Sequence, residues 1–405
     1  MDRALMEGNP HSVLEGLIIA AYAMGSHKGF IYVRMEYPLA VQNATLALQQ
    51  AREYGLLGEN ILGTGFDFDV SIHRGAGSFV SGESTALMNA LEGWVGEPRP
   101  KYVHTSQKGL WGRPSALNNV ETFANVPLII EHGAKWFNSI GTERSKGTKI
   151  FSLVGKVNNT GLVEVPMGMT LADIIYKIGG GIPGNKKLKG VQTGGPSGGI
   201  IPARYLNTPV DFDELTSLGS MMGSGSIIVI DEDTCAVDLA RYFVDFLCSE
   251  SCGKCLPCRE GLKRMREILD AIESGRGTET DIQTLQEIAE LMRTASLCAL
   301  GRTAVNPVLS TIRYFREEYD AHIKDKRCPA LSCKSLVSYS IDPEICIGCD
   351  LCRENCPQGA IYKDDGGFAV VDQSKCMRCG ICFEICPKKV RAVVRESKGL
   401  PGGKR

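Results

Sequence analysis

The sequence contains no hydrophobic run long enough to cross a membrane. A membrane-spanning helix needs about 20 apolar residues. The longest apolar run, GLIIAAYAMG at residues 16–25, is only about half that length and follows Glu15. We therefore expect a buried helix at this position and no direct membrane insertion.

The sequence also lacks a charge excess and a secretory signal. Its formal net charge is −1, which gives no electrostatic basis for binding nucleic acid. The first residues, MDRALMEGNPH, carry acids and lack the basic-then-apolar order of a signal peptide. We expect a cytoplasmic protein, in which the 16 cysteines bind metal or stay reduced rather than forming disulfides.

Periodicity changes along the chain and predicts several folded regions. Helical periodicity at 11–25 and 38–54 alternates with β-rich segments at 29–36 and 66–74, which is typical of an α/β layer. Short strands, a helix and glycine-rich turns then predict a β-grasp module, and amphipathic segments predict a helical bundle. The predicted boundaries are 1–145 for the α/β domain, 146–230 for the β-grasp, 231–323 for the bundle, 324–337 for a linker, 338–396 for a C-terminal α+β domain and 397–405 for a polar tail.

The C-terminal α+β domain contains two copies of a C-x2-C-x2-C-x3-C-P motif. In such a pair the first three cysteines of each copy hold one [4Fe–4S] cluster, and the fourth reaches the other cluster. Zinc ribbons would be the alternative, but two complete copies favour a bacterial-type 2[4Fe–4S] ferredoxin. The predicted ligand sets are Cys346, Cys349, Cys352 and Cys386 for one cluster, and Cys376, Cys379, Cys382 and Cys356 for the other.

A third cysteine cluster precedes the bundle helices in ESCGKCLPCREG. Cys252, Cys255 and Cys258 have the spacing of a cluster-binding loop but need a fourth thiolate, and zinc remains an alternative metal. Cys298 in TASLCALGRTAVNP is the predicted fourth ligand, because glycine and proline bend the backbone nearby. Cys235 and Cys248 are also candidates, although single cysteines at helical spacing are usually small buried apolar residues.

These motifs resemble a known family. ESCGKCLPCREGL and SLCALG, preceded by RGAGSFVSGESTALMNALEGWVGEPRP and GLWGRPSALNNVETFANVP, are similar to the NADH-binding flavoprotein subunit of complex I. The appended ferredoxin domain makes the chain most similar to β subunits of NAD-linked, often electron-bifurcating [FeFe]-hydrogenases. The resemblance implies FMN and NAD(H) as cofactors beside three [4Fe–4S] clusters.

The resemblance also implies flavin-site residues. It assigns Gly82 and Glu83 to the flavin and nicotinamide neighbourhood, with Glu83 as the catalytic candidate, and assigns Asn118, Asn119 and Thr122 to FMN binding. Phe79 and Ser84 differ from the tyrosine and glutamate that are frequent in the family. From the residues alone, GAG and SGES would be interpreted as a turn and a helix cap.

The segment HIKDKRCPALSC contains a possible zinc site. His322, Cys328 and Cys333 have a spacing compatible with three tetrahedral ligands, and similar subunits are thought to carry zinc there. A fourth ligand is not visible in the sequence. The alternative is a linker with two free thiols and a histidine at a helix end.

The flavin site is expected to be incomplete. In complex I flavoproteins a glycine-rich loop and an acidic DEG turn lie upstream of the segment that matches Met1, so the resemblance implies truncation at the N-terminus and weak FMN binding. The glycine clusters at 179–184 and 194–199 lie in the β-grasp module and lack the strand-loop-helix context of a phosphate site.

We therefore expect an NADH dehydrogenase (diaphorase)-type subunit of an oxidoreductase complex. It would move electrons between NAD(H), FMN and three [4Fe–4S] clusters. The implied partners are a thioredoxin-like [2Fe–2S] subunit and a hydrogenase or formate dehydrogenase catalytic subunit, or ferredoxin. The alternative is a non-catalytic, polyferredoxin-type electron-transfer module.

Overall fold

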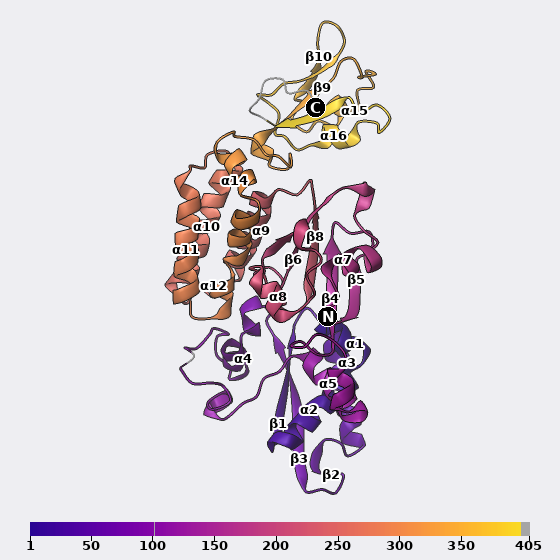
Figure 1. Cartoon of the computed structure of the whole chain (residues 1–405), viewed down its shortest axis with the longest axis vertical. Helices are drawn as coiled ribbons and strands as arrows, with labels where there is room; N and C mark the ends of the chain where they lie inside the picture. The colour runs from indigo at the N-terminus through magenta and orange to yellow at the C-terminus, as the bar shows by residue number, and fades with distance from the viewer. Residues whose placement is uncertain (101, 398–405) are drawn as a thin grey trace.

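The computed structural model describes residues 1–100 and 102–397. Figure 1 shows the N-terminal α/β region at one end of the molecule and the cysteine-rich C-terminal region at the other. The helical bundle lies beside the β-grasp module between them. This arrangement confirms the predicted fold class.

The N-terminal region is a three-stranded sheet covered by helices. The strand order is β1-β3-β2, with β1 parallel and β2 antiparallel to β3. Gly16 permits close packing of α2 on α5, because a Cβ there would lie 1.9 Å from the carbonyl oxygen of Phe123. The elements are α1 (Asp2–Gly8), α2 (Pro10–Met24), β1 (Lys28–Arg34), α3 (Pro38–Glu53), β2 (Gly58–Ile61), β3 (Phe66–Gly75), η1 (Phe79–Gly82), α4 (Ser84–Leu91), η2 (Leu110–Gly112), α5 (Val120–His132) and α6 (Ala134–Asn138).

The β-grasp module is a five-stranded sheet with its own apolar core. The strand order is β5-β4-β8-β6-β7, and Leu171, Ile174 and Ile175 are fully buried against it. An ion pair between Lys149 on β4 and Glu121 joins the sheet to α5. The elements are β4 (Thr148–Gly155), β5 (Gly161–Pro166), α7 (Leu171–Asp173), η3 (Ile174–Ile178), η4 (Pro183–Asn185), β6 (Leu188–Thr193), β7 (Ile200–Pro202), η5 (Ala203–Tyr205), α8 (Phe212–Ser217) and β8 (Ser226–Asp231).

The helical bundle buries the apolar stripes of its amphipathic helices. Leu262, Leu269 and Leu285 are fully buried in its core, as the helical spacing of apolar residues predicts. A buried ion pair between Lys189 on β6 and Glu318 on α14 joins the bundle to the β-grasp. The elements are α9 (Ala236–Glu250), α10 (Leu256–Glu273), α11 (Thr280–Ala295), α12 (Ala299–Thr303), α13 (Asn306–Tyr314) and α14 (Arg316–Ile323).

The C-terminal region repeats one small unit twice. A short helix follows the second cysteine of each copy, and the residue before each helix, Asp350 or Gly380, has a left-handed backbone. Antiparallel pairs β9–β12 and β10–β11 complete the fold. The elements are η6 (Lys334–Leu336), β9 (Val337–Ile341), α15 (Leu351–Glu354), β10 (Ile361–Lys363), β11 (Ala369–Val371), α16 (Ile381–Ile385) and β12 (Val393–Ser397).

Within residues 1–100 and 102–397, none of the helices has the length and apolar character that crossing a membrane would require.

Candidate cofactor and metal sites

The first cysteine pocket lies where α9, α10 and α12 meet. Cys252, Cys255, Cys258 and Cys298 all line it, together with apolar residues such as Leu297 and Leu300. The structure thus brings the predicted fourth cysteine to the triplet, although 40 residues separate Cys258 from Cys298 along the sequence. The other candidates, Cys235 and Cys248, are not among the described residues that line this pocket.

Two of these cysteines lie at the start of a helix. Cys255 is the N-cap of α10, where Pro257 follows in the first turn, and Cys298 is the N-cap of α12. Backbone N–H groups at a helix N-terminus stabilise negative charge. At Cys298, the backbone N–H groups of Gly301 and Leu300 act in this way and oppose the effect of burial on the pKa of the thiol.

Without a metal, the same pocket disfavours several thiolates at once. Burial raises the pKa of Cys258 to about 11, and neighbouring cysteines add to the effect, while the Ser251 hydroxyl opposes it. Burial also raises the pKa of Cys298. Four cysteines in one low-dielectric pocket need a compensating positive charge, and bound iron would supply it, so this donor set fits a [4Fe–4S] cluster.

The C-terminal region contains two further cysteine pockets. Cys386 lies in the pocket of the first motif, and Cys356 lies in the pocket of the second. The structure therefore has the crossed arrangement that the duplicated motif predicts. The first pocket is lined by Cys346, Cys349, Cys352 and Cys386, and the second by Cys356, Cys376, Cys379 and Cys382.

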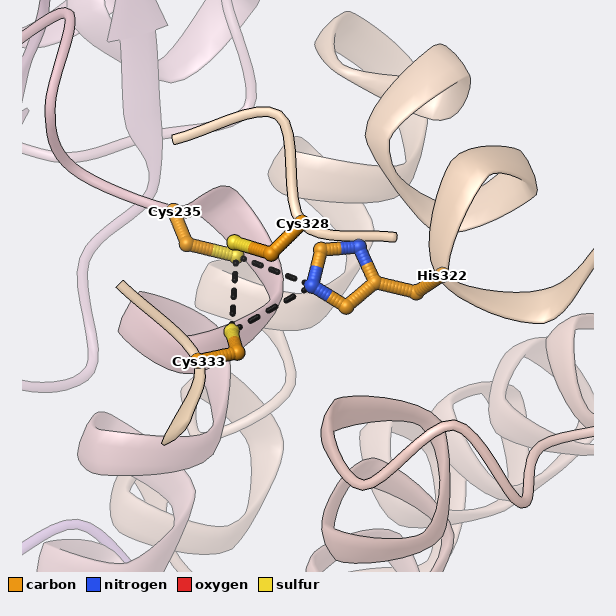
Figure 2. Close-up of side chains that lie close together, drawn as sticks. All are labelled: Cys235, His322, Cys328 and Cys333. Carbon is orange, nitrogen blue, oxygen red and sulfur yellow. Dashed lines mark hydrogen bonds between the residues drawn. The ribbon is translucent and has the colours of Figure 1, made fainter. Parts of the chain in front are cut away.

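A fourth group of side chains, which could hold a metal ion, comes from the start of α9, from α14 and from the segment between α14 and β9 (Figure 2). Cys235, His322, Cys328 and Cys333 are all buried, and their ligand atoms lie within 4.8 Å of one another. His322 Nε2 lies 3.3 Å from Cys333 Sγ and 3.5 Å from Cys235 Sγ. We call these four residues the tetrad.

The hydrogen bond on the other side of the His322 ring leaves Nε2 available as a ligand. His322 Nδ1 donates to the Glu318 carbonyl oxygen at 2.7 Å, which places the proton on Nδ1 and leaves a lone pair on Nε2. Hydrogen bonding to Cys235 and Cys328 raises the pKa of Cys333. Three thiols and one imidazole are the Cys3His donor set that is common in structural zinc sites.

Sequence reasoning missed Cys235 as the fourth member of this tetrad. Cys235 is the N-cap of α9, and 87 residues separate it from His322. The expected linker at 324–337 is folded into the protein here, since Cys328 and Cys333 are fully buried. The only available signal was an unassigned cysteine just before a predicted amphipathic helix.

A large open pocket lies beside the first cysteine pocket. It has a volume of about 670 Å³ and is lined by the end of β3 and the GAG turn, by residues 93–96, and by residues 249–252. Val80, Ser251 and Cys252 line both this pocket and the Cys252 pocket. The two cavities therefore share a wall.

The predicted flavin residues lie near this region but have structural roles as well. Glu83 is the N-cap of α4, where its carboxylate accepts hydrogen bonds from the N–H groups of Thr85 and Ala86. Gly82 is exposed just before it, and neither Gly82 nor Glu83 is among the described residues that line the open pocket. SGES therefore forms the helix cap that its residues predict.

The other predicted flavin residues lie at the start of α5. Asn118, Asn119 and Thr122 are all exposed. Asn119 is the N-cap of α5 and donates through Nδ2 to Asp2 at 2.8 Å. These side chains are thus accessible to a ligand, and their role in binding FMN remains a prediction.

Four family models match consecutive parts of the chain. The Nuo51 FMN-binding domain matches residues 1–128, the SLBB domain 150–201, the NADH-ubiquinone oxidoreductase-F iron-sulfur binding region 238–322 and the 4Fe-4S dicluster domain 338–387. The matches follow the four folded regions of the structure.

Curated relatives match across most of the chain. The NADP-reducing hydrogenase subunit HndC of Solidesulfovibrio fructosivorans is 52% identical over 357 residues, which cover 88% of this chain and 73% of that protein. An NADH-quinone oxidoreductase F-type polypeptide of Rhizobium meliloti is 43% identical over 81% of this chain and 78% of its own length. Its Escherichia coli counterpart is 41% identical over 80% of this chain and 73% of its own length.

A solved structure shows the same fold. The NAD+-reducing [NiFe]-hydrogenase in its H2-reduced state superposes with a TM-score of 0.72 at 32% identity, over 80% of this chain. The match spans 54% of that hydrogenase chain. Together with the relatives and the family models, this similarity shows that the chain belongs to the family that contains the F-type polypeptides of NADH-quinone oxidoreductase and the hydrogenase polypeptide HndC.

Proposed function

We propose that this chain is an electron-transfer subunit of an NAD(H)-linked oxidoreductase complex. Electrons would pass between NAD(H), FMN and three [4Fe–4S] clusters, toward a hydrogenase, a formate dehydrogenase or a ferredoxin. The relatives are themselves oxidoreductase and hydrogenase subunits, which supports this proposal.

The shared wall of the two cavities carries the proposal. Val80, Ser251 and Cys252 separate the open pocket from the Cys252 pocket, so an electron leaving a ligand in the first would cross a single layer of side chains to reach a cluster in the second. A flavin, when bound, converts a two-electron hydride into single electrons. The chain supplies a cavity on each side of that wall.

The lining of the open pocket suits an anionic, aromatic ligand. Arg74 lines the open pocket and offers a planar charged group that can bind phosphate. Gly75 leaves room for the Tyr32 ring, because a Cβ there would lie 2.4 Å from the Tyr32 hydroxyl oxygen. We also retain Glu83, Gly82, Asn118, Asn119 and Thr122 as proposed flavin and nicotinamide contacts.

The C-terminal pockets provide an exit toward partner proteins. Cys349 and Cys379 are exposed, so clusters at these sites would each have an edge near the surface. We propose that a partner catalytic subunit or a ferredoxin exchanges electrons there, and that a thioredoxin-like [2Fe–2S] subunit joins the same complex. The 16 free cysteines support a location in the reducing cytoplasm.

Anaerobic maturation of the full chain with iron, sulfide and FMN tests the proposal. We expect about twelve iron atoms per chain, bound FMN, and reduction of a viologen dye by NADH. The contrary result is a chain without flavin whose clusters are reduced by dithionite but not by NADH. This result would contradict the dehydrogenase role and favour the non-catalytic electron-transfer module.

We further propose that the tetrad binds one zinc ion. The ion would fasten the start of α9 and the end of α14 to the segment that leads into β9. Cys235→Ser should remove stoichiometric zinc, as measured by mass spectrometry of the metal content. Cys248→Ser, which changes a half-buried cysteine on the same helix, is the matched control and should retain it. An unaltered chain without zinc would contradict the proposal.

A further inference from the structure

A serine hydroxyl lies beside one cysteine of the Cys252 pocket. Ser251 Oγ lies 3.4 Å from Cys258 Sγ. The Gly253 N–H donates to Ser251 Oγ at 3.3 Å, which occupies a lone pair of the hydroxyl and leaves its proton for another acceptor. A cluster-bound Cys258 thiolate has no proton, so in that contact it can only accept.

The loop holds this hydroxyl in place. Gly253 has a φ of +74°, which few other residues adopt without strain. Arg259 Nη1 donates to the Gly253 carbonyl oxygen at 2.7 Å. The orientation of Ser251 therefore follows from a glycine turn that is fixed by a side chain of α10.

A second serine hydroxyl lies behind the same cysteine. Ser296 is 2% exposed, and its Oγ has no hydrogen-bond partner among the described residues. A Cβ at Gly301 would lie 2.6 Å from Ser296 Oγ and 3.0 Å from Cys258 Cβ, so Gly301 lets the two side chains approach each other. A buried hydroxyl without a partner costs about 1–3 kcal/mol, and sulfur of a bound cluster is an acceptor that would offset this cost.

The C-terminal pockets differ in the kind of group that donates a hydrogen bond to a cysteine sulfur. Ala360 N–H donates to Cys356 Sγ at 3.3 Å, and Arg378 N–H donates to Cys376 Sγ at 3.4 Å. Over residues 338–397, which the structure describes in full, the hydrogen bonds to these two sulfurs come from backbone N–H groups. Hydrogen bonds to cluster sulfurs raise the reduction potential, because they stabilise the more negative reduced state.

We propose that the Ser251 hydroxyl, together with the Ser296 hydroxyl, raises the reduction potential of the cluster held by Cys252, Cys255, Cys258 and Cys298. Ser251 thus acts through the Cys258 sulfur rather than as a cluster ligand, and it sets how readily this cluster accepts an electron. The inference rests on the proposed function, since it requires a cluster in this pocket.

Redox titration of the anaerobically matured full chain, followed by electron paramagnetic resonance, tests the role of Ser251. In Ser251→Ala the reduced-to-oxidised ratio of this cluster at a fixed potential should fall roughly tenfold, which corresponds to about 59 mV for a one-electron couple. The two C-terminal clusters should titrate as before. Ser251→Thr retains the hydroxyl and should restore most of the shift.

The controls separate the possible outcomes. Ser274→Ala removes a hydroxyl at the far end of α10, where it bonds backbone carbonyls, and should leave all potentials unchanged. The proposal is overturned if Ser251→Ala retains twelve iron atoms and the potential of this cluster does not shift. It is also overturned if both Ser251 variants lose the cluster, because that result would assign Ser251 to cluster assembly. An unaltered chain that lacks this cluster would instead contradict the proposed function.

Discussion

At the scale of single residues, cysteine positions at helix starts are the recurring feature. Cys235, Cys255 and Cys298 are each the N-cap of a helix. Most N-caps are small polar residues that satisfy free N–H groups. These three cysteine side chains make no capping hydrogen bond to the helices that they start, so each sulfur is available to a metal centre.

Loss of one pocket cysteine should remove one cluster. In Cys298→Ser we expect iron to fall from about twelve to about eight atoms per chain, because three thiolates hold a [4Fe–4S] cluster poorly. Iron analysis of anaerobically matured protein measures this. Cys248→Ser is the control and should keep all of the iron. Unchanged iron and spectra in Cys298→Ser would show that another ligand completes the pocket.

Glu83 allows a chemical role to be separated from helix capping. Glu83→Gln keeps an oxygen that can accept the α4 N–H bonds but removes the charge. We expect the rate of NADH-dependent viologen reduction to fall by about tenfold or more if the carboxylate orients a donor at the flavin. The melting temperature should change little. A rate equal to that of the unaltered chain would leave Glu83 as a cap only.

At the scale of elements, close contacts between helices and strands depend on a few small residues. The α2–α5 contact requires Gly16, whose Cα faces the Phe123 carbonyl oxygen. Figure 1 shows these helices together on the N-terminal sheet. The sequence alone predicts a buried helix here but not its neighbour, because the apolar face of a helix does not specify which element covers it.

A methyl group at this contact should destabilise the N-terminal region. Gly16→Ala places Cβ 1.9 Å from an oxygen atom of the backbone, and relief of such overpacking costs about 1–3 kcal/mol. We expect the first calorimetric transition to fall by roughly 2–12 °C. Gly8→Ala, which meets no atom within 4 Å, is the control. Equal transitions in the two variants would contradict the packing argument.

How far the sequence predicts the sites depends on how local their residues are. The cysteine motifs are contiguous, so their spacing was enough to predict which residues share the C-terminal pockets. Cys298 is distant from the triplet, but the glycine and proline that bend the backbone near it are visible in the sequence. The sequence predicts three members of the tetrad, but the fourth, Cys235, lies 87 residues from His322. The open pocket is formed by four separate segments of the chain. Only the fold could reveal the fourth tetrad member and this pocket.

At the scale of the whole molecule, the tetrad brings the start of α9 and the end of α14 together with the segment that leads to the C-terminal region. Figure 2 shows its four side chains. The segment after α14 contains Lys324, Lys326 and Arg327, which are cleavage sites for trypsin. In Cys235→Ser we expect faster tryptic cleavage here and release of a C-terminal fragment that retains its iron, because the segment would lose its metal anchor. Cys248→Ser should be cleaved as slowly as the unaltered chain. Equal cleavage of all three proteins would show that packing alone holds the segment.

The tetrad also bears on how the chain unfolds. Cys235 and Cys333 are 98 residues apart, so an ion bound to both closes a long loop in the denatured chain. A covalent crosslink across about 100 residues lowers the entropy of the unfolded ensemble by an amount worth about 4.7 kcal/mol. Disulfides of this kind do not persist under reducing conditions. A coordinated ion would give the protein a comparable restraint that glutathione cannot break by thiol exchange.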